Sequence, residues 1–203
     1  MYQPRYLSGL AAGAMTDSNK IGYVAAFPIP EVIRGINAFA AGVNEVNPDA
    51  TVEVVWTFTW FGPEAETQAA NALLETGADV LAQHQDSTAT GLAAEAAGAK
   101  WISYNTAYGK DSAPEAFVTA PVWDWGPYYV DIVESIIDGT FSTESYWGGM
   151  ETGLVSLYDL SSDVPSDIAT LIREKTDAII DGTLEVEIVE EEFISNVIGT
   201  VNP

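Results

Sequence analysis

The 203-residue sequence has no cysteine, few basic residues and no long apolar run. Without cysteine the chain has no disulfides, thiolate metal ligands or thiol nucleophiles. No stretch approaches the roughly 20 consecutive apolar residues of a membrane-spanning helix, so no transmembrane segment is predicted. The segment 1–15 lacks the basic start of a signal peptide, and Ser8 and Gly9 break its apolar stretch. We interpret it as an ordinary helix, with no signal peptide in this chain.

Basic side chains are scarce relative to acidic ones, with 7 Lys+Arg against 30 Asp+Glu and a formal net charge of -23. Such a surface repels phosphate backbones and anionic lipids, which argues against nucleic acid and membrane-surface partners. An acidic surface suits a saline exterior, where salt screens self-repulsion, and we keep this as a hypothesis. The composition, 47% hydrophobic and 18% charged, is that of a globular protein.

Phosphate-binding glycine motifs and catalytic constellations are also missing. Gly22 does not begin a Gly-x-Gly-x-x-Gly turn, because Phe27 and Pro28 follow the predicted strand there. The single histidine, His84, shares one loop with Asp86 and Ser87, whereas a nucleophilic triad is assembled from elements that converge in space. We therefore favour a polar binding loop over catalysis, and we expect no cofactor and no metal.

The apolar pattern alternates between strand and helix periods and predicts an α/β protein with a parallel sheet covered by helices on both faces. Helices are expected at 2–15, 30–47, 63–75 and 88–97, and strands at 20–26, 51–58, 78–83, 100–104 and 117–119. Beyond residue 120 the expected elements are helix 124–137, strand 153–157 and helix 165–180. The acidic run 185–192 is interpreted as a solvated edge or end.

Aromatic and polar residues collect where the predicted strands end. In open α/β sheets that edge is where ligands bind, and flat rings there suit stacking on a planar ligand. The aromatic candidates are Phe27, Trp60, Phe61, Tyr104, Trp123 and Trp125, and the polar candidates are Asp86 and Asn105. For Trp123 and Trp125, packing in a hinge or core is an equally weighted alternative.

Several long segments also carry a family resemblance. They are YQPRYLSGLAAGAM, KIGYVAAFPIPEVIRGINAFAAGVNEVNP, WTFTWFGPEAETQAANALLETGADVLAQHQDS, APVWDWGPYYV, YWGGMETGLVSL and TDAIIDGTLE. In this order they cover nearly the whole chain, and they resemble the basic membrane protein (BMP) family of ABC transporter substrate-binding proteins.

The resemblance implies a type I periplasmic-binding-protein-like fold, in which two α/β lobes close over a purine nucleoside or nucleobase. It further implies no catalysis, transfer of the ligand to a membrane permease, and a lipoprotein location in the periplasm or on the outer face of the cell membrane. Phe27 would lie against the base and Trp60 at the cleft edge. Asp86 and Asn105 would contact base or sugar, and Trp123 would lie at the return crossing.

The resemblance also exposes a departure, because family members carry a lipoprotein signal and a whole first lobe before the helix that begins here at Tyr2. It divides the chain into a helix of the first lobe or hinge (1–19), a complete second lobe (20–118), and a return crossing with the remaining part of the first lobe (119–203). We expect one complete lobe plus part of the other, with exposed apolar surface that a longer product or a partner would cover.

Other classes compete with a transport receptor. An effector-binding or sensory domain can have the same fold, although a transcriptional regulator would also need a basic DNA-binding helix. A small hydrolase would need a convincing acid–base pair in the cleft. A purely structural module would not need aromatic rings at strand ends.

Overall fold

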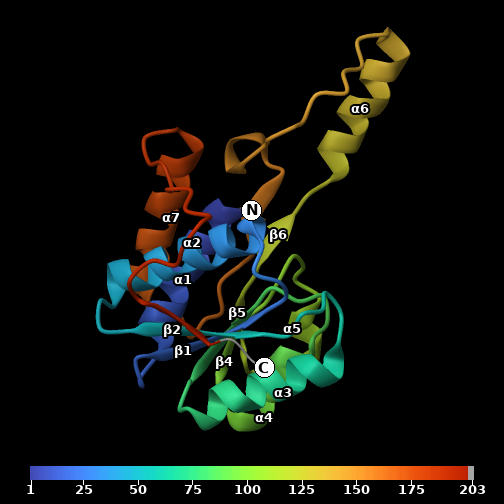
Figure 1. Cartoon of the computed structure of the whole chain (residues 1–203). Helices are drawn as coiled ribbons and strands as arrows, with labels where there is room; N and C mark the ends of the chain where they lie inside the picture. The colour runs from blue at the N-terminus through green and yellow to red at the C-terminus, as the bar shows by residue number, and fades with distance from the viewer. Residues whose placement is uncertain (201–203) are drawn as a thin grey trace.

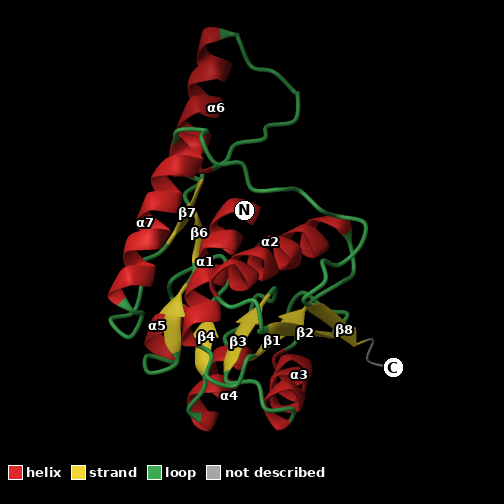
Figure 2. Cartoon of the chain, turned by 90° about the vertical axis from the view of Figure 1, so that its left-hand side faces the viewer, coloured by secondary structure: helices red, strands yellow, loops and turns green. Residues whose placement is uncertain are grey.

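The computed structural model describes residues 1–200, and a six-stranded sheet forms its centre (Figure 2). The strand order is β5-β4-β3-β1-β2-β8, and every neighbouring pair is parallel. The strands are β1 (Lys20–Ala25), β2 (Thr51–Trp56), β3 (Val80–Gln83), β4 (Lys100–Ile102), β5 (Phe117–Thr119) and β8 (Val197–Thr200). All residues of β3 and β5 are buried, as expected for strands covered on both faces.

Helices cover both faces of this sheet (Figure 2). The covering helices are α1 (Tyr2–Met15) and α2 (Pro30–Val46) on one face, and α3 (Pro63–Glu75) and α4 (Ala89–Ala97) on the other. Each layer has its own apolar core, one around Phe39 and the other around Trp101. Pro30 and Pro63 stand in the first turns of α2 and α3, where a missing N–H costs no hydrogen bond. The prediction of a parallel sheet flanked by helices is confirmed.

Helices α1 and α2 pack at unusually close range because glycines lie between them. A Cβ added at Gly42 would lie 2.0 Å from the carbonyl oxygen of Tyr6, and one added at Gly9 would lie 2.0 Å from that of Phe39. No larger residue fits at either position without separating the helices. The close contact fixes α1 against α2 and therefore above the sheet.

A second group of elements lies beside the sheet. Strands β6 (Pro121–Trp123) and β7 (Val155–Leu157) form an antiparallel pair, and α7 (Ser166–Ile180) packs beside α1. Helix α6 (Gly126–Asp138) projects away from the rest of the chain and has no buried residue (Figure 1). Its exposed apolar side chains include Tyr129, Val130, Val133, Ile136 and Ile137. The expected exposed apolar surface is therefore present.

The segment after α7 crosses α2 and returns to the sheet. Asn37 of α2 donates hydrogen bonds to the carbonyl oxygens of Val189 (3.0 Å) and Glu192 (2.8 Å), and its own side-chain oxygen accepts one from the Ile194 amide (3.1 Å). Arg34 forms an ion pair with Glu190. Most of the acidic run 185–192 is exposed, as expected, although Val186 is buried.

The remaining differences from the sequence-based expectations are local. The sequence did not indicate β6, β8, the short helix α5 (Gly109–Ser112) or the 3-10 turn Met150–Thr152. The strand expected to reach residue 58 ends at Trp56, because Phe58 has a left-handed φ of 54°. The strand expected to reach residue 104 likewise ends at Ile102, and Asn105 has a φ of 59°. Among the described residues no helix is long and apolar enough to cross a bilayer.

Candidate functional site

A row of rings follows the carboxyl ends of the central strands. Phe27 and Trp60 have ring centroids 5.2 Å apart, Trp60 and His84 5.9 Å, and His84 and Tyr104 4.5 Å. These rings come from the segments after β1, β2, β3 and β4. The row is continuous, so the expectation that rings would gather at this edge agrees with the geometry for Phe27, Trp60 and Tyr104.

Backbone hydrogen bonds fix the loops that carry the row. The amide of Phe58 donates to the carbonyl oxygen of Ala26 (2.9 Å), and the amide of Asp86 donates to that of Trp60 (3.0 Å). Asp86 is thereby held beside Trp60, and its exposed carboxylate forms no hydrogen bond within the described part of the chain. An exposed acceptor beside flat rings can bind an N–H or O–H group of a ligand.

The other two predicted site residues form a separate pair. Trp123 Nε1 donates a hydrogen bond to Asn105 Oδ1 at 3.0 Å, and Asn105 also bridges to Val122 of β6. Neither side chain makes a ring contact with Phe27 or Trp60. The five predicted residues thus fall into two groups, Phe27 with Trp60 and Asp86, and Asn105 with Trp123.

A buried polar cluster supports the row from below, and it contains residues that the sequence did not indicate. Arg5 of α1 is fully buried, its guanidinium carbon lies 4.7 Å from the Tyr104 ring centroid, and its Nη1 donates to the carbonyl oxygen of Gln83 (2.9 Å). Its Nε and Nη2 atoms have no partner among the described residues. Arg5 was missed because an arginine side chain is rarely fully buried.

His84 and Glu31 connect this cluster to the amino-terminal turn of α2. His84 Nε2 lies 3.3 Å from Glu31 Oε1. Burial lowers the pKa of His84 and outweighs the opposing effect of Glu31, so the ring is neutral at neutral pH. Burial also opposes ionisation of Glu31, but the hydrogen bond from His84 and nearby positive charges outweigh it and lower the pKa of Glu31. We therefore assign the proton to Nε2, donating to an ionised Glu31.

The same geometry argues against a catalytic interpretation of this loop. Ser87 Oγ donates to Glu66 and not to His84, whose ring faces Glu31. No nucleophile–base hydrogen bond therefore exists between Ser87 and His84. Within residues 1–200 no group of His, Asp and Glu is arranged to hold a metal ion.

A cavity of 490 Å³ lies between the amino ends of α1 and α2, the start of α6 and the segment 146–154. Its aromatic lining consists of Tyr2, Trp123, Trp125, Tyr128, Tyr146 and Trp147. The charged side chains at its wall are Glu31, Arg34 and Glu151. Of the aromatic residues predicted from the sequence, Trp123 and Trp125 line this cavity. The position of Trp147 at this cavity could not be predicted from the sequence, because the residue lies in a segment without helix or strand periodicity.

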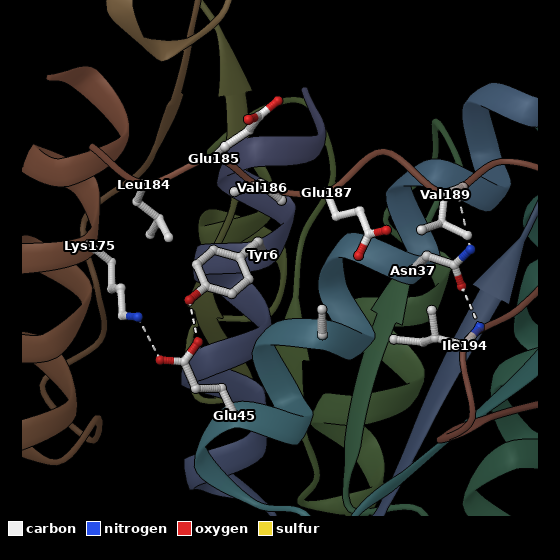
Figure 3. A pocket seen from close by; sticks show the side chains of 11 residues that line it. Tyr6, Asn37, Glu45, Lys175, Leu184, Glu185, Val186, Glu187, Val189 and Ile194 are labelled. Atoms are coloured by element: carbon white, nitrogen blue, oxygen red, sulfur yellow. Dashed lines mark hydrogen bonds and ion pairs between the residues drawn. The ribbon is translucent and has the colours of Figure 1, made fainter. Parts of the chain in front are cut away.

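A smaller cavity of 240 Å³ lies where α1, α2 and α7 meet the segment after α7 (Figure 3). The Tyr6 hydroxyl donates a hydrogen bond to Glu45, and Lys175 Nζ lies 2.7 Å from the same carboxylate. The view shows Leu184 and Val186 lying above these groups. Because Tyr6, Glu45 and Lys175 satisfy one another, we interpret this cavity as part of the packing between helices.

A parallel sheet covered by helices, with a row of rings at its carboxyl edge, places the chain among the open α/β folds, which bind ligands at that edge. The sequence model of the ABC transporter substrate-binding proteins of PnrA type (Bmp) matches residues 1–190. The chain belongs to this Bmp family, which confirms the resemblance stated above. Substrate-binding proteins of ABC transporters are extracytoplasmic transport components.

Two curated relatives carry different ligand names. One is the "Putative ABC transporter glucose-binding protein TsgA13" of Haloferax volcanii. The chain is 43% identical to it over 186 residues, a match that covers 92% of this chain and 47% of the relative. It is 39% identical over 188 residues to a purine-binding protein of Brucella abortus, covering 90% of this chain and 52% of the relative. The chain thus spans about half the length of these relatives.

Solved structures show the same fold. A solute-binding protein of an ABC transporter system from Conexibacter woesei superimposes with a TM-score of 0.75 at 25% identity, over 92% of this chain and 63% of that one. A transcriptional activator of the comK gene from Bacillus halodurans superimposes with a TM-score of 0.81 at 22% identity, over 90% and 64%. The periplasmic-binding-protein-like fold class is thereby confirmed.

Proposed function

We propose that this chain carries the ligand-binding edge of an ABC importer receptor that captures a purine nucleoside or nucleobase and delivers it to a membrane permease. The observation that carries the proposal is the continuous row of Phe27, Trp60, His84 and Tyr104 at the carboxyl edge of the sheet. Family membership supports the transport role. The proposed role requires no catalysis, and it places the protein outside the cytoplasmic membrane.

Within this proposal Phe27 and Trp60 stack on the ligand. Asp86 accepts a hydrogen bond from the ligand, Asn105 contacts it from the loop after β4, and Trp123 contacts it from the return crossing. Trp60 is 41% exposed and therefore accessible to a ligand. Each stacking contact of this kind contributes about 1–3 kcal/mol in nucleic-acid-binding proteins.

Glucose is a second candidate, because the relative from Haloferax volcanii has that name. A hexose presents several hydroxyl groups, and each loses a hydrogen bond to water unless the site replaces it. The row offers mainly ring faces, with the Asp86 carboxylate as a polar group free of partners among the described residues. This composition favours a planar heterocycle over a sugar.

The division into lobes is part of the proposal. Residues 20–118 are taken as one lobe, and residues 119–203 as the return crossing with part of the other. The unburied apolar face of α6 supports a second lobe packed against it in the complete receptor. Residues 1–19 were expected to belong to the first lobe or hinge. Because α1 packs closely on α2, we group them with residues 20–118 in this proposal.

Calorimetry and thermal melting test the ligand class. Adenine, adenosine, guanosine and glucose are titrated into the 203-residue chain, and Trp60→Leu is compared with Phe141→Leu, an exposed aromatic residue outside the row. At a purine concentration of about 100 times Kd we expect roughly 2.7 kcal/mol of stabilisation. Trp60→Leu should weaken binding and Phe141→Leu should not. Binding of glucose without any purine would contradict the proposal.

A further inference from the structure

We propose that the buried side chain of Arg5 binds a single halide ion, chloride or bromide, in the interior between α1, α2 and the sheet. The ion is held by one edge of the guanidinium group, formed by Nε and Nη2. This site is distinct from the ring row at the carboxyl edge of the sheet, because Arg5 lies beneath the row and has no exposed surface.

The first observation is a buried charge without a counter-charge in contact. Arg5 is 0% exposed, and the ion pairs within residues 1–200 all involve other basic side chains. Glu31, the acidic residue at this end of α2, is hydrogen-bonded to His84 instead. A buried charge is strongly destabilising unless an opposite charge and hydrogen bonds compensate it. The surroundings of Arg5 therefore call for an anion.

The second observation is the edge of the guanidinium that remains available. Nη1 donates to the carbonyl oxygen of Gln83 at 2.9 Å, and the guanidinium carbon lies over the Tyr104 ring, 4.7 Å from its centroid. Nε and Nη2 are both buried and have no hydrogen-bond partner in the described part of the chain. These two nitrogens share one edge of the planar group, and their N–H bonds point to the same side. Such an edge is a two-donor site for one anion.

The third observation is space beside this edge. Gly35 of α2 is buried, and a Cβ added to it would lie 4.0 Å from Arg5 Nε and 4.0 Å from His84 Cδ2. Outside its own helix no other atom comes within 4 Å of that point, so the space next to Nε is at least the size of a methyl group. The acceptor nitrogen of His84, Nδ1, is farther away than Cδ2. An anion in this space therefore meets a C–H group of the ring and not its lone pair.

The chemistry of the region selects a monoatomic anion. The Tyr23 hydroxyl is a further buried donor without a partner among the described residues, and its ring centroid lies 5.8 Å from the Arg5 guanidinium carbon. A halide accepts hydrogen bonds and also compensates the charge, whereas a water molecule leaves the charge uncompensated. Sulfate or the carboxylate of a solute exceeds a methyl-sized space that has no opening at Arg5.

The test must separate ion binding from screening, because any salt should stabilise a chain with a net charge of -23. Thermal melts of the chain are recorded in sodium chloride, sodium bromide and sodium gluconate at equal ionic strength. Gluconate screens charge equally but is too large for the site. At a chloride concentration of ten times Kd, linkage predicts a Tm roughly 3–6 °C higher than in gluconate.

Two arginine variants assign this difference to one residue. In Arg5→Met the difference between chloride and gluconate should disappear. Arg173→Met is the matched control, because Arg173 is exposed and hydrogen-bonds only to Thr170 of its own helix within the described residues. In this control the difference should persist, since a general effect of the anions on solvation does not depend on either arginine.

A direct measurement does not depend on whether Arg5→Met folds. Crystals of the unmodified chain are soaked in sodium bromide, and anomalous diffraction at the bromine absorption edge locates the ion. We expect a peak within hydrogen-bonding distance of both Nε and Nη2 of Arg5.

The outcomes are distinct. A bromide peak at Arg5, together with a chloride effect on Tm in the unmodified chain, supports the proposal. Absence of the peak, or an equal chloride effect in Arg5→Met and the unmodified chain, would overturn it. A peak without any chloride effect on Tm would show an adventitious ion only and would also overturn it. None of these measurements uses a transported solute, so they leave the proposed function to its own test.

Discussion

The contact between α1 and α2 allows a sharp prediction, because two glycines of the same helix face different surroundings. At Gly42 an added Cβ would lie 2.0 Å from a backbone carbonyl oxygen, that of Tyr6. At Gly35 the nearest atoms to an added Cβ, from Arg5 and His84, are 4.0 Å away, which is ordinary van der Waals distance. Gly35→Ala is therefore a control with the same chemistry in the same helix.

The magnitudes follow from this geometry. To bring the methyl group that Gly42→Ala introduces even to 3.0 Å from the Tyr6 oxygen, the helix backbones must separate by 3.0 − 2.0 = 1.0 Å. Overpacking of this kind costs about 1–3 kcal/mol or more, and here the clashing atom is backbone and cannot rotate away. Replacing glycine by alanine inside a helix stabilises the folded state by up to about 1 kcal/mol through helix propensity. We expect a net loss of about 2 kcal/mol for Gly42→Ala and a gain of up to about 1 kcal/mol for Gly35→Ala.

Thermal unfolding followed by circular dichroism measures the difference. For a chain of this size 1 kcal/mol shifts Tm by roughly 2–4 °C. Gly42→Ala should lower Tm by about 4–8 °C, and Gly35→Ala should raise it by up to about 4 °C. Equal Tm values for the two variants would refute the close helix contact on which the reasoning depends.

Three further predictions concern pH, the carboxyl-terminal segment and salt. The lowered pKa of His84 means that, below the unfolded value of about 6.5, the unfolded chain binds more protons than the folded one. The free energy of unfolding should therefore fall as pH drops below about 6.5, by at most about 1.4 kcal/mol per pH unit from this residue. Denaturant titrations at several pH values should show that the unfolding free energy of His84→Gln depends less steeply on pH. Asn37→Ala removes the side chain that hydrogen-bonds three backbone groups of residues 189–194. A protease should therefore cleave that segment roughly 30-fold faster. The control Asn44→Ala, on the exposed side of α2, should leave the cleavage rate unchanged. With a net charge of -23, the protein should melt at a lower temperature in dilute buffer than in molar KCl, and an unchanged Tm would contradict the hypothesis of adaptation to salt.

The sheet and its covering helices could be predicted because their signals are local. Pro30 and Pro63 mark helix starts, and the βα segments from Lys20 to Thr119 each show a clear apolar period. Strand β8 produced no comparable signal. It is held beside β2 by contacts that depend on the folded chain, including the hydrogen bond from Asn196 Nδ2 to the carbonyl oxygen of Ala40.

The site divides in the same way. The rings at strand ends could be expected, because the carboxyl edge of a parallel sheet collects the residues that follow each strand. The burial of Arg5 depends on how α1 packs on the sheet, where its guanidinium contacts Gln83 and Tyr104, and no pattern along one helix shows which charged residue the rest of the fold will bury.

The cavity between the amino ends of α1 and α2 could not be predicted from the sequence at all. Its walls come from the ends of two helices, a crossing strand and an irregular segment, so Trp123 has rings beside it only because β6 and α6 bring Trp125 to it. From the sequence, ligand contact and packing were equally weighted interpretations of Trp123. In the structure one face of the Trp123 ring packs on Trp125 and no ring among the described residues covers the other, so the packing is observed and ligand contact stays a prediction. A side chain fixed in this way has already lost most of its rotational freedom before a ligand arrives. Stacking on it therefore costs less entropy than stacking on Trp60, which is 41% exposed. On this ground Trp123 should contribute more to ligand affinity than Trp60, although only Trp60 lies in the row at the edge of the sheet.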